Sequence, residues 1–303
     1  MSLALASLLL SVCNGSTAIP LNQLLLPQNS VILYHIRFPH TFAAFITGSL
    51  LGLSGALMQL LLQNPLADPY VLGISSAAAF FTLLGMLVGL SAEGLLGAGC
   101  AGSLLAISFI FLLARRHRWQ PHRLLLIGIS LASGFSACSS FILLVSSDHA
   151  LHSMLFWLTG DLSTIGPFKL ALFVLIGAAA LSSYLSPRLN LLLRGEDNAR
   201  TLGLATTRFR VILFVMSAIL TATAVNIGGA IGFVGLIIPH GVRLVLKTDD
   251  QRLVLPLSLL LGGTLLTVAD VIARTLFAPT ELPVGMVMTL IGVPVFIWLL
   301  LRS

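Results

Sequence analysis

Charged side chains are scarce in this sequence, since Asp, Glu, Lys and Arg together make up only 9% of its 303 residues. A typical soluble domain carries about 25% charged residues, because its surface must face water. Apolar residues make up 57% of the chain, and its mean hydropathy is +1.04. This composition excludes an ordinary soluble enzyme, a disordered chain and a nucleic-acid-binding protein, and it predicts a surface that faces lipid.

Cysteine is also rare, and Cys13, Cys100 and Cys138 lie far apart in the chain. Such isolated cysteines give neither a disulfide framework nor metal-ligand spacing, so we interpret them as small apolar packing residues. The motifs G-x-x-x-x-G-K-[ST], H-E-x-x-H and G-x-S-x-G are missing as well. We therefore predict no catalytic residue, no metal site and no cofactor bound by this chain.

Long apolar runs, by contrast, are plentiful and predict an all-α protein that crosses the membrane about ten times. A spanning helix needs about 20 mostly apolar residues. Runs such as 170–181 and 253–266 do not alternate between apolar and polar residues, which argues against a membrane β-barrel. The ten spans that we predict, within a single transmembrane domain at 1–303, are residues 1–19, 40–62, 70–90, 94–114, 123–146, 168–186, 208–227, 230–246, 253–273 and 282–301.

Basic residues outnumber acidic ones, 16 to 10, and their positions predict the orientation of the spans. Lys and Arg collect in cytoplasmic loops of membrane proteins. With a cytoplasmic N-terminus, only Arg37, Lys169 and Arg274 fall on the outer side. The 13 basic residues on the cytoplasmic side are Arg115, Arg116, Arg118, Arg123, Arg188, Arg194, Arg200, Arg208, Arg210, Arg243, Lys247, Arg252 and Arg302. This division predicts that both termini are cytoplasmic.

Glycine pairs spaced four residues apart occur within two predicted spans. They are Gly48/Gly52 and Gly85/Gly89. Because glycine lets helix backbones approach closely, these pairs predict a packed bundle.

Two segments interrupt the apolar pattern and carry functional hypotheses. The first lies between two spans and contains Asn64, Pro65, Asp68 and Pro69. Asn-Pro and Asp-Pro are typical of a turn, and a turn is the structural interpretation. The functional interpretation is a gating element, which the similarity described below supports.

The second segment covers 228–243 and is dense in glycine. Gly232, Gly235 and Pro239 belong to it, and this density predicts a broken or short helix of the kind found along transport pathways. His240 follows Pro239 directly and is either a structural hydrogen-bonding group at a helix end or a ligand or proton relay.

The longest predicted cytoplasmic loop, at about 187–207, contains a short helical pattern. Acidic and amide residues at 196–198 suit the start of a helix, and a glycine at 203 suits its end. The loop is either a solvated, positively charged connection or a docking helix for a cytoplasmic partner. Its candidate residues are Arg194, Gly195, Glu196, Asp197, Ala199, Arg200, Leu202 and Gly203.

Asp270 and Arg274 lie four residues apart near the outer end of a predicted span. Charges in lipid usually pair, so the two form an intrahelical salt bridge or Arg274 faces outward to a partner. Asp270 is also the one acidic residue within the predicted spans. An ion-coupled secondary transporter, the main alternative function, would need more such carboxylates.

These segments resemble the permease subunits of bacterial ABC importers for iron chelates, haem and cobalamin, the FecCD-type family. The similarity runs from about residue 36 to the C-terminus. Its motifs are 36–39 (IRFP), 55–59 (GALMQ), 64–69 (NPLADP), 72–75 (LGIS), 199–203 (ARTLG), 229–240 (GAIGFVGLIIPH), 269–274 (ADVIAR), 281–285 (ELPVG) and 290–294 (LIGVP).

The resemblance implies a cobalamin-importer-like fold and a multi-pass location in the bacterial inner membrane. It implies a second permease subunit, with a homodimer as the simplest case, and two cytoplasmic subunits that bind ATP and Mg²⁺. It further implies an external binding protein that delivers an iron-siderophore, haem or cobalamin. The chain itself would then be a transport subunit and no enzyme, which fits the missing phosphate-binding motif.

The resemblance also assigns roles to residues. Arg37 and Arg274 match arginines that pair with glutamates of the binding protein, whereas His40 stands where the family commonly has arginine. The segment 194–203 matches the coupling helices that sit on the ATP-binding subunit. Asn64, Pro65, Asp68, Pro69, Gly232, Gly235, Pro239, His240 and Asp270 match structural or gating motifs.

Overall fold

The computed structural model describes residues 2–14, 33–116, 119–162, 168–193, 195–278 and 280–301. Within these ranges the chain is helical and contains no strand. The all-α prediction is therefore confirmed.

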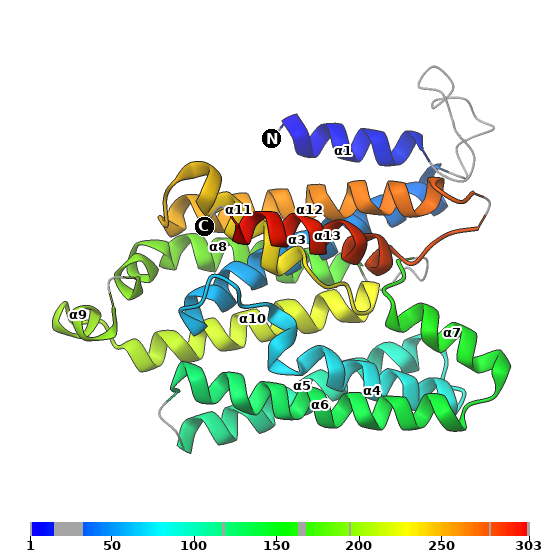
Figure 1. Ribbon diagram of the computed structural model, residues 1–303, viewed down its shortest axis with the longest axis horizontal. Helices are drawn as coiled ribbons and strands as arrows, with labels where there is room; N and C mark the ends of the chain where they lie inside the picture. The colour runs from blue at the N-terminus through cyan, green and yellow to red at the C-terminus, as the bar shows by residue number, and fades with distance from the viewer. Residues whose placement is uncertain are drawn as a thin grey trace.

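The helices lie side by side in a bundle whose long axis runs across Figure 1. α9 marks one end of the bundle, the α9 end, and α7 lies at the opposite end, the α7 end. In chain order the elements are α1 (Ser2–Cys13), η3 (Leu33–Arg37), α3 (Phe38–Leu62), η4 (Pro69–Leu72), α4 (Ile74–Leu87), α5 (Ala92–Arg116), α6 (Pro121–Val145), α7 (Asp148–Leu158), α8 (Phe168–Leu192), α9 (Glu196–Thr201), α10 (Thr206–Gly228), α11 (Val234–Leu246), α12 (Gln251–Thr275) and α13 (Val284–Leu300).

Ten apolar helices of the described part correspond to the ten predicted spans. Six are long and apolar enough to cross a membrane, namely η3 with α3, α5, α6, α8, α10 and α12. The other four, α1, α4, α11 and α13, are apolar but have only 10–17 residues. A helix of 13 residues extends about 20 Å, which is less than the roughly 30 Å of the hydrocarbon core. The approximate count is confirmed, while four spans are shorter than predicted.

Three boundaries differ from prediction, and the last of these differences has a local cause. The predicted loop after residue 147 contains α7. The predicted span at 1–19 is helical over Ser2–Cys13, and residues 15–19 lie outside the described ranges. α8 continues past Pro187 to Leu192. Proline leaves the carbonyl four residues earlier without its usual donor, and Ser186 Oγ donates to that Ser183 carbonyl at 2.8 Å.

The same order of elements occurs twice along the chain. A long helix, a break, a short helix and a 25-residue helix occur as α3, η4, α4 and α5, and again as α10, residues 229–233, α11 and α12. α3 and α10 run in opposite directions through the bundle (Figure 1). This inverted arrangement is common in transporters, with discontinuous helices near the repeat interface.

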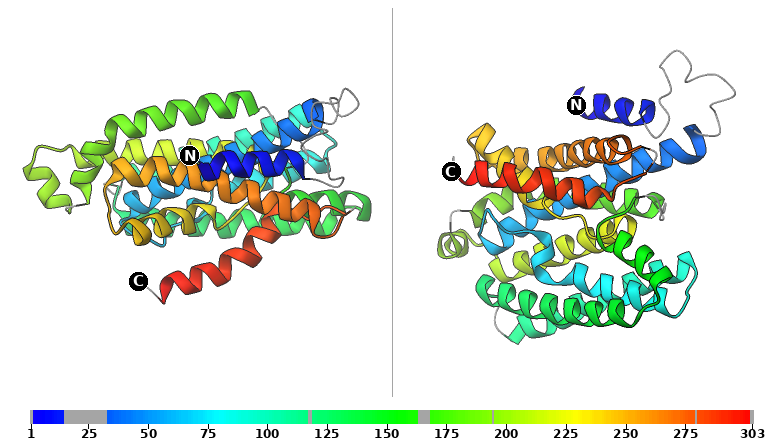
Figure 2. Two further views of the ribbon diagram at one scale, coloured as in Figure 1. Left: turned by 90° about the horizontal axis from the view of Figure 1, so that it is seen from above. Right: turned by 45° about the vertical axis from the view of Figure 1, so that its right-hand side comes forward.

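α3 forms the centre of the bundle, and nearly all of its side chains are buried. α8 and α13 flank the bundle on opposite sides, with α1 lying over α12 (Figure 2). Gly48 and Gly52 allow α3 to contact α12 backbone to backbone, at Ser258 and Gly262. The first predicted glycine pair is therefore a packing motif. The second is not, because Gly89 lies beyond the end of α4 and faces open space.

Candidate functional site

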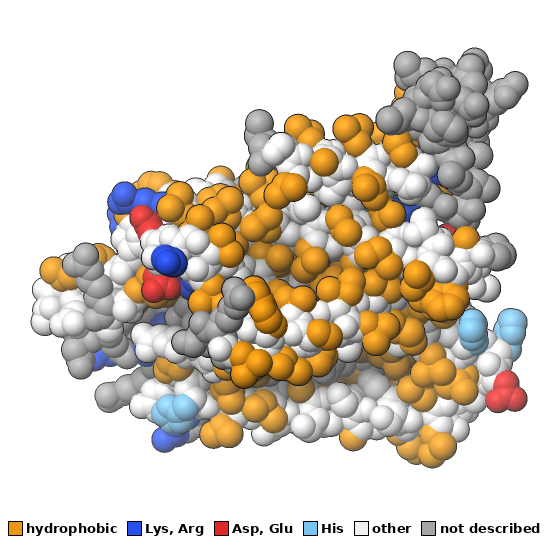
Figure 3. Space-filling view, turned by 45° about the horizontal axis from the view of Figure 1, so that its top comes forward, with side chains coloured by type: hydrophobic (Ala, Val, Ile, Leu, Met, Phe, Trp, Pro, Cys, Tyr) orange, Lys and Arg blue, Asp and Glu red, His pale blue; other side chains and the backbone are white. Residues whose placement is uncertain are grey.

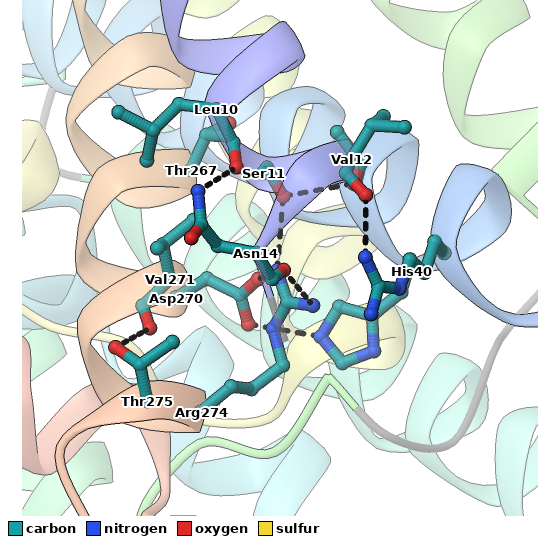
Figure 4. A network of polar contacts seen from close by, with 12 residues as sticks. Leu10, Ser11, Val12, Asn14, His40, Thr267, Asp270, Val271, Arg274 and Thr275 are labelled. Carbon is teal, nitrogen blue, oxygen red and sulfur yellow. Dashed lines mark hydrogen bonds and ion pairs between the residues drawn. The ribbon is translucent and has the colours of Figure 1, made fainter. Parts of the chain in front are cut away.

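A buried group of charged side chains lies at the α7 end, between α3 and α12 (Figure 4). Asp270 Oδ1 lies 2.9 Å from His40 Nε2. Asp270 Oδ2 lies 2.7 Å from Arg274 Nη2, one helical turn along α12. Asp270 is 2% exposed, so its charge is neutralised by these partners instead of by water. The predicted intrahelical salt bridge is confirmed.

Two arginines of this region cap the carboxyl end of α1. Arg37 Nη1 donates to the carbonyls of Val12 and Cys13, at 2.8 and 3.0 Å. Arg274 Nη2 donates to Ser11 Oγ at 2.9 Å. The last carbonyls of a helix have no partner within it, and they carry partial negative charge that favours a cation. Both guanidinium groups therefore hold α1 in place.

The three predicted docking residues thus lie close to one another, but they are buried. Arg37, His40 and Arg274 are 4%, 9% and 6% exposed. The expectation that Arg274 faces outward differs from this arrangement, because its Nη2 contacts both Asp270 and Ser11 of α1. The role of the three residues in docking stays a prediction.

The predicted short helix of the long loop is α9, which projects at the far end of the bundle (Figure 1). Glu196 and Asp197 form its first turn. Gly195 before it has φ +94° and Gly203 after it has φ +82°. Glycine tolerates such left-handed backbone, so the sequence fixes both ends of this helix. The predicted helix and its glycine end are confirmed.

The remaining residues of this segment have different surroundings. Ala199 is fully buried and anchors α9 to the bundle, whereas Leu202 is 58% exposed. Arg200 Nε donates to Thr206 Oγ1 at 3.2 Å, which ties α9 to the start of α10. Arg194 lies outside the described residues. The role of this segment in coupling stays a prediction.

A cavity of about 360 Å³ with both polar and apolar lining residues opens beside α9, between the ends of α3, α8 and α11. Gly195 lines it, together with Gln59, Arg243 and Asp249. Arg243 Nη1 donates to Gln59 Oε1, and its Nε lies 3.5 Å from Asp249 Oδ1. Gln59 Nε2 in turn donates to the Leu236 carbonyl at 3.2 Å. The cavity wall is therefore a network that links α3 to α11.

The two predicted interrupted segments meet in the structure. Asp68 caps η4 by accepting the Tyr70 N–H at 2.8 Å, and its carboxylate also accepts the Phe233 N–H. The Tyr70 hydroxyl accepts the Ile231 N–H at 2.9 Å. Pro69 packs against Gly235 at the start of α11. The sequence predicted two separate functional segments, and the structure shows that they contact each other through these residues.

Other residues of the two segments play smaller parts. Asn64 Oδ1 accepts the Leu66 N–H at 3.0 Å and so forms a turn, as predicted, next to an exposed Pro65. Gly232 faces open space, and Pro239 lies within α11. The His240 side chain is buried, and its Nε2 has no hydrogen-bond partner in the described part of the chain. The structure therefore supports neither a structural hydrogen bond of His240 Nε2 nor a role of His240 as a ligand or proton relay.

Sequence reasoning missed the parts of Gln59, Tyr70 and Arg243 in these networks. Gln59 carried a usable signal, since it is a lone amide within an apolar run, and buried polar groups need partners. Tyr70 carried none, because tyrosine after a turn is ordinary. The partner of its hydroxyl lies 161 residues later in the chain.

The pH dependence of stability is expected to reveal the titration of the partly buried Asp68. Burial raises the pKa of its carboxyl to about 6, while the N–H groups of Tyr70 and Phe233 lower it. The folded protein then binds this proton more tightly than the unfolded chain, whose Asp pKa is about 3.9. This contribution to stability is therefore present below about pH 4 and lost as pH rises to about 6.

Thermal unfolding of detergent-solubilised protein between about pH 4 and pH 6.5 tests this expectation. Asp68→Asn removes the titration and should flatten the profile. Asp148→Asn, at an exposed position on α7, is the matched control and should leave the profile as it is. Parallel profiles for Asp68→Asn and the unsubstituted protein would contradict the assignment.

Comparison with known proteins matches residues 3–302 to the FecCD transport family. The vitamin B12 import system permease protein BtuC of Klebsiella pneumoniae subsp. pneumoniae is 39% identical, over 99% of this chain and 92% of that protein. The protein of the same name from Salmonella typhimurium is 38% identical, over 99% of this chain and 93% of that protein.

Solved structures agree with this match. A metal-chelate type ABC transporter in an inward-facing conformation superposes with a TM-score of 0.92 at 30% identity, covering 100% of this chain and 97% of that chain. PsaBC from Streptococcus pneumoniae, in complex with Fab, has a TM-score of 0.59 at 16% identity over 90% of this chain and 93% of that one, and it shares the fold alone. The chain belongs to the FecCD transport family and is the transmembrane permease subunit of an ABC importer.

Proposed function

We propose that two copies of this permease form a pathway in the bacterial inner membrane for a large metal chelate. Two separate cytoplasmic subunits bind ATP and Mg²⁺ and hydrolyse the ATP, and an external binding protein delivers the chelate. The permease itself is no enzyme and needs no cofactor. Alternating access, driven by the ATP-binding subunits, carries the chelate inward.

Cobalamin is the chelate that the comparisons favour. The named relatives with 38–39% identity are vitamin B12 import permeases, and the similar solved structure is a metal-chelate type transporter. Ferric siderophores and haem share the chemical description of a large metal chelate and are the alternatives within the same class.

The α9 end is the cytoplasmic end in this proposal, and both termini lie on that side. Lys and Arg side chains gather at the α9 end of the molecule (Figure 3), as expected for cytoplasmic surfaces. α9 is the observation that carries the proposal. It is a short helix held by Ala199 and bounded by two glycines, and it offers Leu202 to a partner at this basic end.

The α7 end then receives the binding protein. Carboxylates of that protein would replace the α1 carbonyls as acceptors for Arg37 and would approach Arg274 and His40. A carboxylate can accept two parallel hydrogen bonds from one guanidinium group and carries a full negative charge, which a backbone carbonyl does not. Docking in this proposal therefore displaces the end of α1.

An ion-coupled secondary transporter is the alternative function. It requires a carboxylate that is free to bind the coupling ion. Asp270 already contacts both His40 and Arg274 and is 2% exposed. This arrangement argues against an ion site at Asp270.

Uptake by the complete complex in proteoliposomes tests the function. We expect uptake of labelled cobalamin that needs ATP and stops with vanadate. Uptake that is insensitive to vanadate and is abolished by an ionophore would favour the secondary transporter. ATP-dependent uptake of a ferric siderophore or haem in place of cobalamin would correct the substrate alone.

Arg37→Glu is expected to weaken binding-protein docking at least tenfold, because a charge-assisted hydrogen bond contributes about 1.5–3 kcal/mol. Basal ATP hydrolysis should persist, while its stimulation by loaded binding protein should be lost. Lys169→Glu is the matched control, since this exposed cation lies at the α7-end start of α8. Arg37→Gln keeps donors for α1 and shows whether charge matters. Normal stimulation with Arg37→Glu would contradict the docking role.

A further inference from the structure

The break between α10 and α11 leaves backbone N–H groups without helical partners. Residues 229–233 are non-helical, and α11 begins only at Val234. Within a membrane protein each such N–H group needs a partner supplied by the protein, since lipid offers none. Ile231 and Phe233 find theirs on the side chains of Tyr70 and Asp68.

These bonds hold an unusual backbone conformation. Phe233, the residue before α11, has φ +71°. Bulky residues rarely adopt this left-handed region, and they persist there only when their surroundings hold them. The carboxylate of Asp68 accepts the N–H of this residue. Asp68 therefore contacts the backbone at the residue from which α11 begins.

The segment that carries Asp68 and Tyr70 is itself fixed to the rest of the bundle. Gly128 of α6 lies against the backbone of Val71 and Leu72, leaving no room there for a side chain. On the other side, the Pro69 ring contacts Gly235. η4 is thus packed between α6 and the start of α11. The short helices α4 and α11, one from each repeat, begin at this common point.

The stretch from the break through α11 reaches a cavity at each end of the molecule. Arg243, near the end of α11, lines the cavity beside Gly195 at the α9 end. Ala230, in the break, lines a second cavity of about 450 Å³ together with Thr159 of the α7 region and Gly285 of α13. Residues 230–243 therefore form a continuous physical connection between the two cavities.

We propose that Asp68 and Tyr70 are positioning residues of the transport cycle. Their hydrogen bonds fix the backbone of the break at 229–233 against η4, so that α11 and the break move as one unit about this point. A displacement of the coupling segment at 194–203 moves the end of α11 that carries Arg243. Because the break keeps its conformation, Ala230 moves as well, and this changes the shape of the cavity that Ala230 lines. The proposal rests on the proposed function, because it requires ATP-driven movement at α9.

Tyr70→Phe tests the proposal in the complete complex, since it removes one hydroxyl and keeps the ring. We expect chelate uptake per ATP hydrolysed to fall about fivefold, the shift that one lost hydrogen bond gives. ATP hydrolysis itself should continue. Tyr184→Phe is the matched control, because this exposed ring on α8 stacks with Arg188 and should show full coupling.

Two substitutions at Asp68 separate hydrogen bonding from charge. Asp68→Asn keeps an acceptor oxygen and should retain coupling, whereas Asp68→Ala removes it and should uncouple uptake from hydrolysis. Amide hydrogen exchange of the solubilised permease reports the bonds directly. Exchange at Ile231 should rise in Tyr70→Phe, and exchange at Phe233 should rise in Asp68→Ala.

If Tyr70→Phe raises amide exchange at Ile231 but leaves chelate uptake per ATP unchanged, the hydrogen bond has a structural role only, and the proposal is overturned. Unchanged amide exchange at Ile231 in Tyr70→Phe would overturn it too, because the Tyr70 hydroxyl would then not stabilise the backbone of the break. A complex without ATP-driven uptake even when unsubstituted would instead overturn the proposed function, and this proposal with it.

Discussion

Gly52→Leu is expected to abolish the folded permease. A Cβ on Gly52 would overlap the Ser258 carbonyl of α12, and the Gly262 backbone lies only 3.2 Å away. Backbone atoms cannot swing aside as a side chain does, so α3 and α12 would have to separate along the centre of the bundle. Overpacking of a tight core costs about 1–3 kcal/mol or more, and the loss of helix contacts adds to that.

Gly177→Leu is the matched control for this substitution. Gly177 lies in the span α8, is exposed, and has open space where its Cβ would be. The yield of monodisperse protein after detergent extraction distinguishes the two. We expect none with Gly52→Leu, a reduced yield with Gly52→Ala and an ordinary yield with Gly177→Leu. Equal yields would contradict the packing.

Asp270→Ala is expected to destabilise the protein by about 3–5 kcal/mol, because removing one partner leaves a buried charge uncompensated. Arg274 and His40 would keep their places, at 6% and 9% exposure, without the carboxylate between them. The loss should appear as a lower unfolding midpoint, accompanied by faster amide exchange in α1, which Arg274 also holds.

The double substitution Asp270→Leu with Arg274→Met, compared with Asp270→Leu alone and Arg274→Met alone, forms a double-mutant cycle. Replacing both members of a buried pair by apolar residues is often close to neutral. We expect the double variant to recover most of the midpoint lost in Asp270→Ala. A double variant that is less stable than both single variants would show that the two charges do not act as a pair.

Local chemistry explains which features were predictable from sequence. Glycines at 195 and 203 and acidic residues between them define α9, because capping depends on neighbours in the chain. Gly48 and Gly52 predicted close packing for the same reason, since their spacing alone puts them on one helix face. Runs of apolar residues located the spans because lipid selects them.

Long-range contacts explain what was missed. The pairing of Tyr70 with Ile231 spans 161 residues, and no local pattern encodes it. Arg37 and Arg274 were expected to meet a binding protein because they match docking arginines of the family, with an intrahelical salt bridge to Asp270 as the other interpretation of Arg274. The structure instead uses them to cap α1, a role that depends on where α1 packs.

The capping of α1 also sets an order of assembly. α1 precedes α12 by most of the described chain, yet the hydroxyl of its Ser11 bonds to Arg274, 263 residues later. At about 5–20 residues per second, synthesis of the intervening chain takes roughly 13–50 s. Until α12 is inserted, α1 lacks both the helix it lies on and the contact of its Ser11 with Arg274. α1 is thus made well before α12, yet it reaches its final place only after α12 has been inserted.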